Sequence, residues 1–187
     1  MVKRQSDRSV YSVSEQDQQM IQGCVAGDRL AQKKLYDRYK DAMYTLCFRI
    51  TNDPEAAQDA LQESFIGIFR GIHLFRAEST LGAWIKSIVV RTTYRHVRRQ
   101  IQHEPLEQVS REESADWGHE LDAGYLAEAI QSLPTGYRMV FVLIEVEGYS
   151  HKEVATMLGV STGTTKSQLF HAKRQLQFKL KALGVYP

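Results

Sequence analysis

Apolar residues along this chain recur mostly every three or four positions and rarely alternate strictly with polar ones. That period is typical of helices that bury one face, so we predict an all-α protein. The pattern indicates two helices within 14–48, broken near Gly27, and further helices over about 55–70 and 81–100. A second helical block begins near Leu126.

A helix-start signal precedes the helix at 55–70. Asp53 is a good N-cap, Pro54 fits the first helical position, and Glu55 lies where the helix dipole favours negative charge. Residues 71–80 are expected to form a loop before the next helix. One apolar stripe is expected to be buried, formed by Ala57, Leu61, Phe65, Ile68 and Ile72.

Residues 101–127 differ from the rest because they are polar, acidic and poor in aliphatic side chains. We predict a flexible linker there, between helical domains at 14–100 and 128–187, with 1–13 as an N-terminal tail. The net charge of +2 hides an uneven distribution. The first 100 residues carry 16 basic and 11 acidic side chains, the linker 1 and 7, and the remainder 7 and 4.

The C-terminal block contains a predicted helix-turn-helix. Ser150 and Glu153 have the spacing of a capping box, and Gly159 lies where a turn needs a left-handed backbone. A second helix is expected from about Thr162. Its inward stripe would be Thr165, Leu169, Ala172, Leu176 and Leu180.

The other side of that second helix is a candidate DNA-reading surface. From residue 160 to 187 there are five Lys or Arg and no Asp or Glu. Small hydroxylated residues at a helix start let the backbone approach phosphates, and basic side chains reach phosphates or base edges. The alternative is a solvated basic face on a core helix. The candidates are Thr162, Gly163, Thr164, Lys166, Ser167, Phe170, His171 and Arg174.

A second basic surface is expected on the helix at 81–100, where four arginines follow helical spacing. An aromatic beside arginines suits stacking on an unpaired base, and the loop before the helix could shape a pocket for it. The alternative is that both aromatics belong to the core. The candidates are Phe75, Arg76, Ser79, Trp84, Lys86, Arg91, Arg95, Arg98 and Arg99.

Opposite chemistry is expected on the helix at 55–70, where Asp59, Gln62 and Glu63 share the side away from the apolar stripe. A solvated acidic face is the ordinary explanation. Since such a face would repel DNA, it is also suited to docking a basic protein surface.

Composition narrows the remaining classes. No apolar run approaches the roughly 18 residues of a membrane span, and no apolar stretch follows the N-terminus, so we expect no membrane insertion and a cytoplasmic protein. Cys24 and Cys47 are expected to be buried thiols. The six histidines are scattered, without metal-ligand spacing, phosphate loop or nucleophile motif, so we expect no catalysis, metal or cofactor.

Four segments in order make the chain resemble the extracytoplasmic-function (ECF) sigma factors of bacterial RNA polymerase. They are residues 59–65 (DALQESF), 84–88 (WIKSI), the span from Leu133-Pro134 to 147–150 (EGYS), and 160–167 (VSTGTTKS). The resemblance covers nearly the whole chain, from about Ser14 to Leu180. It implies two helical domains, regions 2 and 4 of the sigma family, and a function in promoter recognition.

The resemblance also implies partners. Asp59, Gln62, Glu63 and Phe65 would grip the coiled coil of the largest catalytic subunit of core RNA polymerase. Family members are often held inactive by an anti-sigma factor, and apolar surfaces near Phe65 and Phe170 would suit that contact.

Promoter DNA is the other implied partner. The loop at 74–80 and the helix from Trp84 would read the −10 element and hold the strand open. Residues 162–174 would read the −35 element, and the acidic linker would thread the RNA channel of the polymerase. Many members carry Asn and Asp where this chain has Arg91 and Arg95, so the −10 preference of the family is not carried over.

Linker length bears on promoter binding. Promoter elements about 17 base pairs apart are separated by about 60 Å. A flexible 27-residue linker spans roughly 30 Å on average and about 90 Å when extended. We therefore expect that polymerase fixes the spacing and that free protein binds promoters poorly.

One rival interpretation is a helix-turn-helix activator or repressor whose N-terminal block senses a ligand. It differs from the sigma-factor interpretation at Asp59, Gln62 and Glu63, because a sensor domain has no need of that face.

Overall fold

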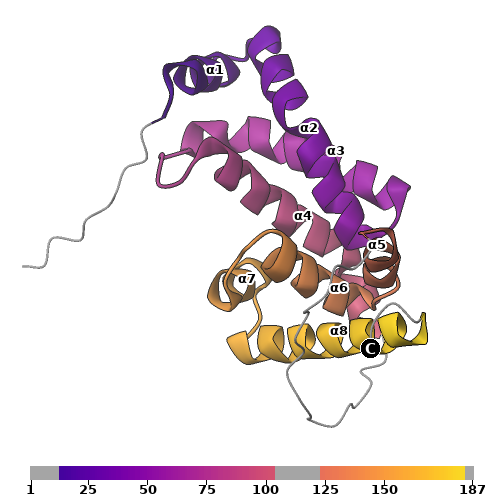
Figure 1. The fold of residues 1–187 in the computed structure, drawn as a ribbon. Coiled ribbons are helices and arrows are strands. Elements are labelled where there is room, and N and C mark those ends of the chain that lie inside the picture. The colour runs from indigo at the N-terminus through magenta and orange to yellow at the C-terminus, as the bar shows by residue number, and fades with distance from the viewer. Residues whose placement is uncertain (1–12, 104–122, 184–187) are drawn as a thin grey trace, which may run out of the picture.

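The computed structural model of the protein describes residues 13–103 and 123–183. All regular secondary structure in these two ranges is helical, which confirms the all-α prediction. Figure 1 shows two groups of helices, one above the other. The expected tail and most of the expected linker lie outside the described residues.

The N-terminal group is a bundle in which α2, α3 and α4 pack together and α1 covers one end of α2 (Figure 1). Side chains from the three longer helices fill its core, including Leu35, Leu46, Ile68, Ile85 and Val89. The elements are α1 (Glu15–Val25), α2 (Arg29–Thr51), α3 (Pro54–Gly71), the 3₁₀ turn η1 (Ile72–Leu74) and α4 (Leu81–His103).

Local chemistry explains where these helices begin. The break near Gly27 is confirmed, since Gly27 has a φ of 77° and the Asp28 carboxylate accepts a hydrogen bond from the Leu30 amide at 2.8 Å. The Asp53 carboxylate likewise accepts from the amides of Glu55 and Ala56 at 2.8 and 3.1 Å, so it caps α3 as predicted.

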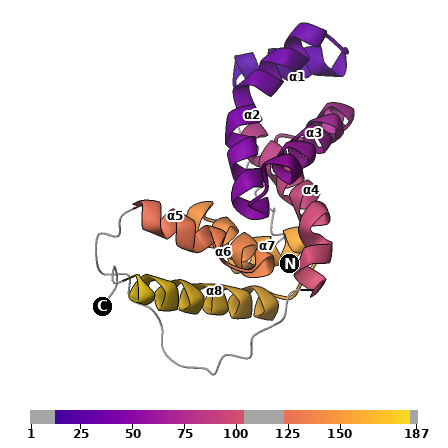
Figure 2. The same ribbon diagram turned by 90° about the vertical axis from the view of Figure 1, so that its right-hand side faces the viewer.

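The C-terminal group lies below the bundle, with α8 along its base (Figure 2). The apolar helix expected over 136–147 is interrupted, because Val142–Val146 forms a π-helical turn that ends before Gly148 at a φ of 76°. The elements are α5 (Ala123–Gln131), α6 (Thr135–Phe141), the π-helical turn η2 (Val142–Val146), α7 (His151–Leu158) and α8 (Thr162–Ala182).

The predicted helix-turn-helix is confirmed in α7 and α8. Ser150 and Glu153 form a capping box, and Gly159 is left-handed with a φ of 67°. Ser161 adds a second cap, because its hydroxyl accepts from the Thr164 amide at 2.9 Å. Every member of the expected inward stripe of α8 is buried: Thr165, Leu169, Ala172, Leu176 and Leu180.

Helices occupy both ends of the stretch expected to be a linker. Helix α4 continues to His103, and α5 already begins at Ala123. The side chain of Ile101 is half-buried and packs close to Gly136, where an added Cβ would lie 3.2 Å from an Ile101 methyl carbon. The acidic residues between 104 and 122 are not described.

Both cysteines are buried, as predicted. Burial raises the pKa of the Cys47 thiol, which also lies 3.3 Å from the Thr93 hydroxyl. The thiolate, which is the reactive form, is therefore disfavoured in the folded protein.

The cap of α7 gives a stability prediction. Ser150→Ala removes the hydroxyl that accepts from the Glu153 amide, and loss of such a cap costs about 1 kcal/mol. Thermal unfolding should shift to lower temperature, whereas Thr156→Ala, which removes a hydroxyl from the exposed side of the same helix, should leave it nearly unchanged. Equal shifts for the two variants would contradict the role of the cap.

The same cap predicts a dependence on pH. Hydrogen bonds from the Ser150 hydroxyl and amide lower the pKa of Glu153 below its usual value. A depressed carboxyl pKa stabilises the fold above the unfolded-state pKa, and this contribution is lost as the pH falls through the folded-state value. The gap in melting temperature between the parent and Ser150→Ala should therefore narrow in acid.

Candidate nucleic-acid interfaces

The acidic face of α3 is exposed as predicted. Asp59, Gln62 and Glu63 all point to solvent, opposite the buried stripe of the helix. The Glu63 carboxylate also contacts α4, where it lies 3.1 Å from an Arg95 nitrogen and 2.7 Å from the His96 ring. Glu63 therefore belongs to the acidic face and to the border of the basic helix beside it.

Phe65 is a correction to the predicted docking face. It is only 3% exposed, and its ring packs edge-on against Tyr36 at a centroid distance of 4.7 Å. Phe65 lies on the same stripe as the buried Leu61 and Ile68, so the helical period directs it inward. It is a core residue and is not available to a partner.

An apolar member of the acidic face was missed in the sequence. Ile66 is 50% exposed and follows Gln62 by four residues and Glu63 by three, so it lies on the same side of α3. Its position outside the buried stripe was the available signal. A carboxylate face with one apolar side chain is better suited to a protein partner than a purely charged one.

The loop before α4 holds its two aromatics together. The half-buried rings of Phe75 and Trp84 meet edge to face with centroids 5.6 Å apart. Ala77 between them has a left-handed φ of 54°, which is uncommon for alanine and sets the course of the loop. Arg76 is exposed and Ser79 half-buried, so both aromatics keep a solvent-facing part beside polar neighbours.

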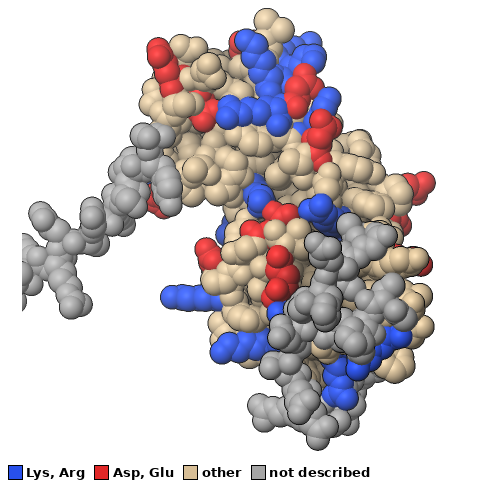
Figure 3. Space-filling model, in the orientation of Figure 1, with Lys and Arg blue, Asp and Glu red and all other residues tan. Residues whose placement is uncertain are grey.

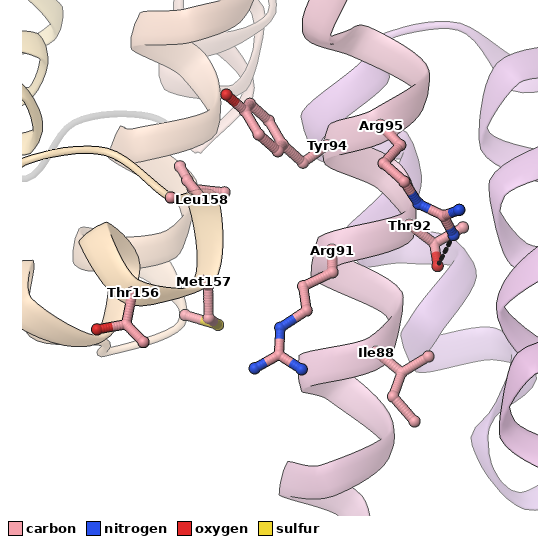
Figure 4. A pocket seen from close by; sticks show the side chains of 9 residues that line it. Ile88, Arg91, Thr92, Tyr94, Arg95, Thr156, Met157 and Leu158 are labelled. Carbon is pink, nitrogen blue, oxygen red and sulfur yellow. Dashed lines mark hydrogen bonds between the residues drawn. The ribbon is translucent and has the colours of Figure 1, made fainter. Parts of the chain in front are cut away.

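The arginines of α4 do not all point the same way. Figure 4 shows Arg91 and Tyr94 extending from α4 toward α7, whereas Arg95 points away from it and donates to the Thr92 hydroxyl at 3.2 Å. Arg98 and Arg99 are exposed further along the helix. The expected single stripe is thus divided between a side that faces α7 and a side that faces α3.

Lys86 was expected to contact DNA, and the structure gives it a protein partner. Its ammonium group lies 2.6 Å from the carboxylate of Glu147, which belongs to the C-terminal group of helices. The pair is partly buried, with 30% of the Lys86 side chain and 13% of the Glu147 side chain exposed. In this arrangement Lys86 is not open to a nucleic acid.

The start of α8 is open to solvent, as predicted for a DNA-reading helix. Thr162, Gly163, Thr164, Lys166 and Ser167 are all exposed. Figure 3 shows basic side chains that project beside α7 and the beginning of α8. The backbone amides, small side chains and positive charge expected of a phosphate-contacting helix end therefore occur together here.

Further along α8 the predicted outward face turns inward. His171 is a correction, because its ring stacks on Tyr137 of α6 at 5.5 Å and its Nδ1 atom is buried. Phe170 is half-buried and contacts the same imidazole edge-on, and Arg174 is also half-buried. The DNA-reading part of α8 is thus concentrated in its first two turns.

Searches for other chemistry ended as follows. Within the described ranges, no group of three or more His, Cys, Asp or Glu side chains is arranged to hold a metal ion. None of the helices in those ranges is both long enough and apolar enough to cross a membrane.

Comparison with known families matches both halves of the chain. The family described as Sigma-70 region 2 matches residues 35–101, and the family described as Sigma-70 region 4 matches residues 123–176. These matches contain the acidic face of α3, the basic helix α4 and the helix-turn-helix of α7 and α8.

Curated relatives agree over nearly their full length. The ECF RNA polymerase sigma factor SigM of Mycobacterium tuberculosis is 32% identical over 163 residues, covering 86% of this chain and 82% of SigM. The RNA polymerase sigma-H factor of Pseudomonas aeruginosa is 28% identical over 186 residues, covering 90% and 96%. The chain has the regions of a sigma factor, and it belongs to the family of ECF RNA polymerase sigma factors.

Two solved structures share the fold. The sigma factor RpoE in complex with the anti-sigma factor NepR from Bartonella quintana matches with a TM-score of 0.56 and 24% identity, over 80% of this chain and 96% of that one. CnrH in complex with the cytosolic domain of CnrY matches with a TM-score of 0.55 and 20% identity, over 89% and 97%.

The correction at Phe65 leads to a prediction. Phe65→Ala should destabilise the protein by about 3–5 kcal/mol, because it leaves a cavity in the core. Ile66→Ala, one residue away on the exposed face, should change stability by less than about 0.5 kcal/mol. Urea unfolding of the two variants measures the difference, and a stable Phe65→Ala variant would contradict the assignment of Phe65 to the core.

Proposed function

We propose that this protein binds core RNA polymerase and directs it to promoters by reading the −10 and −35 elements and helping to melt the DNA. The observation that carries the proposal is the matched order of regions 2 and 4 on one chain, each with its own exposed basic surface. The rival ligand-sensing regulator is not favoured, because the N-terminal block matches region 2.

The polymerase contact in this proposal is the exposed side of α3. Asp59, Gln62 and Glu63 supply the polar part, and Ile66 replaces Phe65 as the apolar part. Charged rims raise association rates and select partners, and an apolar centre adds contact that excludes water.

The −10 element in this proposal meets the start of α4 and the loop before it. Phe75 and Trp84 offer ring faces for an unstacked base, and Arg76 and Ser79 lie beside them. Arg91, Arg95, Arg98 and Arg99 supply positive charge for the strand backbone. Lys86 can join them only after it leaves Glu147.

The −35 element meets the exposed start of α8. Thr162, Gly163 and Thr164 bring backbone amides to a phosphate, and Lys166 and Ser167 lie one turn further on. Phe170, His171 and Arg174 have a smaller part because packing restricts them. The proposed division is region 2 at 14–100, the linker at 101–127 and region 4 at 128–187.

An anti-sigma factor is a further proposed partner. RpoE and CnrH, which share the fold, were both solved with one, NepR and the cytosolic domain of CnrY respectively. We also place the protein in the cytoplasm and assign it no catalytic step, since its relatives are sigma factors. Run-off transcription with purified core polymerase and a genomic promoter library tests the function as a whole.

The polymerase contact can be tested by removing its polar part. The triple variant Asp59→Ala, Gln62→Ala and Glu63→Ala should remain folded, because all three side chains are exposed, and should lose most of its affinity for core polymerase. Co-purification and fluorescence titration measure the loss. A triple variant that binds and initiates like the parent would remove the basis of the proposed contact.

Two controls separate docking from other effects. A double variant, Asp59→Ala with Gln62→Ala, retains the contacts of Glu63 with Arg95 and His96 and should still bind weakly. A matched set of three exposed α1 residues, Glu15, Gln16 and Gln19, carries the same kind of change and should bind normally.

The contribution of α8 can be tested by salt dependence. If Lys166 contacts a phosphate, Lys166→Ala should weaken promoter binding by the holoenzyme and reduce the slope of log K against log salt by about 1. Arg29→Ala, an exposed charge at the start of α2, should leave the slope unchanged. The same slope for Lys166→Ala and the parent would show that Lys166 makes no phosphate contact.

A further inference from the structure

A buried arginine joins the two groups of helices. Arg138 of α6 is 5% exposed, and its guanidinium donates at 3.0 and 3.1 Å to the backbone carbonyls of Ile50 and Thr51 at the end of α2. It also donates to the carbonyls of Gln131 and Leu133 at 3.0 and 2.7 Å. One side chain therefore satisfies carbonyl groups of both domains.

A charged rim surrounds this contact. Glu147 lies between Lys86 of α4 at 2.6 Å and Arg49 of α2 at 3.8 Å. The side chain of Asn52 donates to the carbonyl of Gln131 at 3.3 Å. Carbonyls, a guanidinium and charged side chains can all be hydrated when the domains part, so the contact is suited to opening reversibly.

The contact covers the proposed −10 surface. Arg91 and Thr92 of α4 line one pocket of about 570 Å³ together with Met157 and Gly159, as the close view in Figure 4 shows for the first three. Helix α7 thus lies over the side of α4 that includes Arg91.

A second cavity shows the same covering at the aromatic end. Trp84 and Ser79 line it on one side, and Tyr149 and Lys152 line it on the other. A single strand that stacked on Trp84 would have to share this space with the residues that lead into α7.

The closed arrangement also conflicts with promoter geometry. Arg91 belongs to the −10 surface, and Gly159 lies in the turn that leads into the −35 helix, yet both line one pocket. The two promoter elements lie about 60 Å apart. The protein cannot read both elements unless the domains separate.

We propose that the free protein is held closed by its own region 4, which covers the −10 surface through the Arg138 contact and the Glu147 rim until polymerase separates the domains. The inference rests on the proposed function for its meaning. The closure itself is a property of the free chain and can be measured without polymerase.

The test reverses one charge in the rim. Glu147→Lys replaces the anion between Lys86 and Arg49 by a third cation and should open the domains. Glu128→Lys is the matched control, because Glu128 is exposed on α5 in the same domain and the variant has the same net charge. Both substitutions avoid the residues assigned to DNA or polymerase.

Small-angle scattering of the free proteins gives the first readout. A compact chain of 187 residues has a radius of gyration of about 16 Å. The parent and Glu128→Lys should stay near their common compact value, and Glu147→Lys should exceed it by about one third, as two separated domains on a flexible linker would. An extended parent, or equal radii for the two variants, would overturn the proposal.

Binding of a fluorescent single-stranded −10 oligonucleotide to the same free proteins gives the second readout. Glu147→Lys should bind about tenfold more tightly than Glu128→Lys, because more of the protein is in the binding-competent state. Equal affinities would show that the −10 surface is not covered. Run-off activity of the parent with core polymerase tests the sigma function separately, so either failure can be recognised.

Discussion

Helix α4 must satisfy two opposed demands, and the structure depends on how it meets them. One side of the helix buries Ile85, Val89 and Val97 against α2 and α3, which holds the N-terminal bundle together. The other sides carry arginines that a nucleic acid can use only if they remain hydrated and unpaired. Because a helix surface is narrow, the neighbours α3 and α7 both reach these arginines, and each border is a place where binding and packing compete.

The sequence predicted the helices because their start signals are local. Asp53 and Ser150 cap the helices that the pattern assigned to them, and Gly159 takes the left-handed turn. The buried stripes of α3 and α8 also follow from spacing alone, since a period of 3.6 fixes which residues share a face. Two helical units with a helix-turn-helix at the end were therefore predictable in detail.

The sequence did not predict how single side chains divide between core and surface at the edges of a stripe. Phe65 was assigned both to the buried stripe and to the docking face, and three-dimensional packing against Tyr36 decides for the core. His171 lies at the margin of the outward face of α8, and Tyr137 draws it inward. Neither Tyr36 nor Tyr137 is near its partner in sequence, so the spacing within one helix could not reveal these contacts.

Contacts between the two domains were beyond the sequence for the same reason. Arg138 lies in an apolar stretch where it looked like an interruption, and its role appears only when the end of α2 is brought beside it. The charge of the acidic linker was evident, but the acid that meets Lys86 comes from Glu147 in the folded C-terminal domain.

The position of Glu63 has a thermodynamic consequence. Its carboxylate is shared between the outer side of α3 and the cations of α4, since it contacts both Arg95 and His96. Whatever attracts Glu63 outward leaves Arg95 with one anion fewer, and an anion that attracts Arg95 loosens Glu63 by the same free energy. The two faces are thus linked through one carboxylate, and occupation of either side lowers the cost of occupying the other.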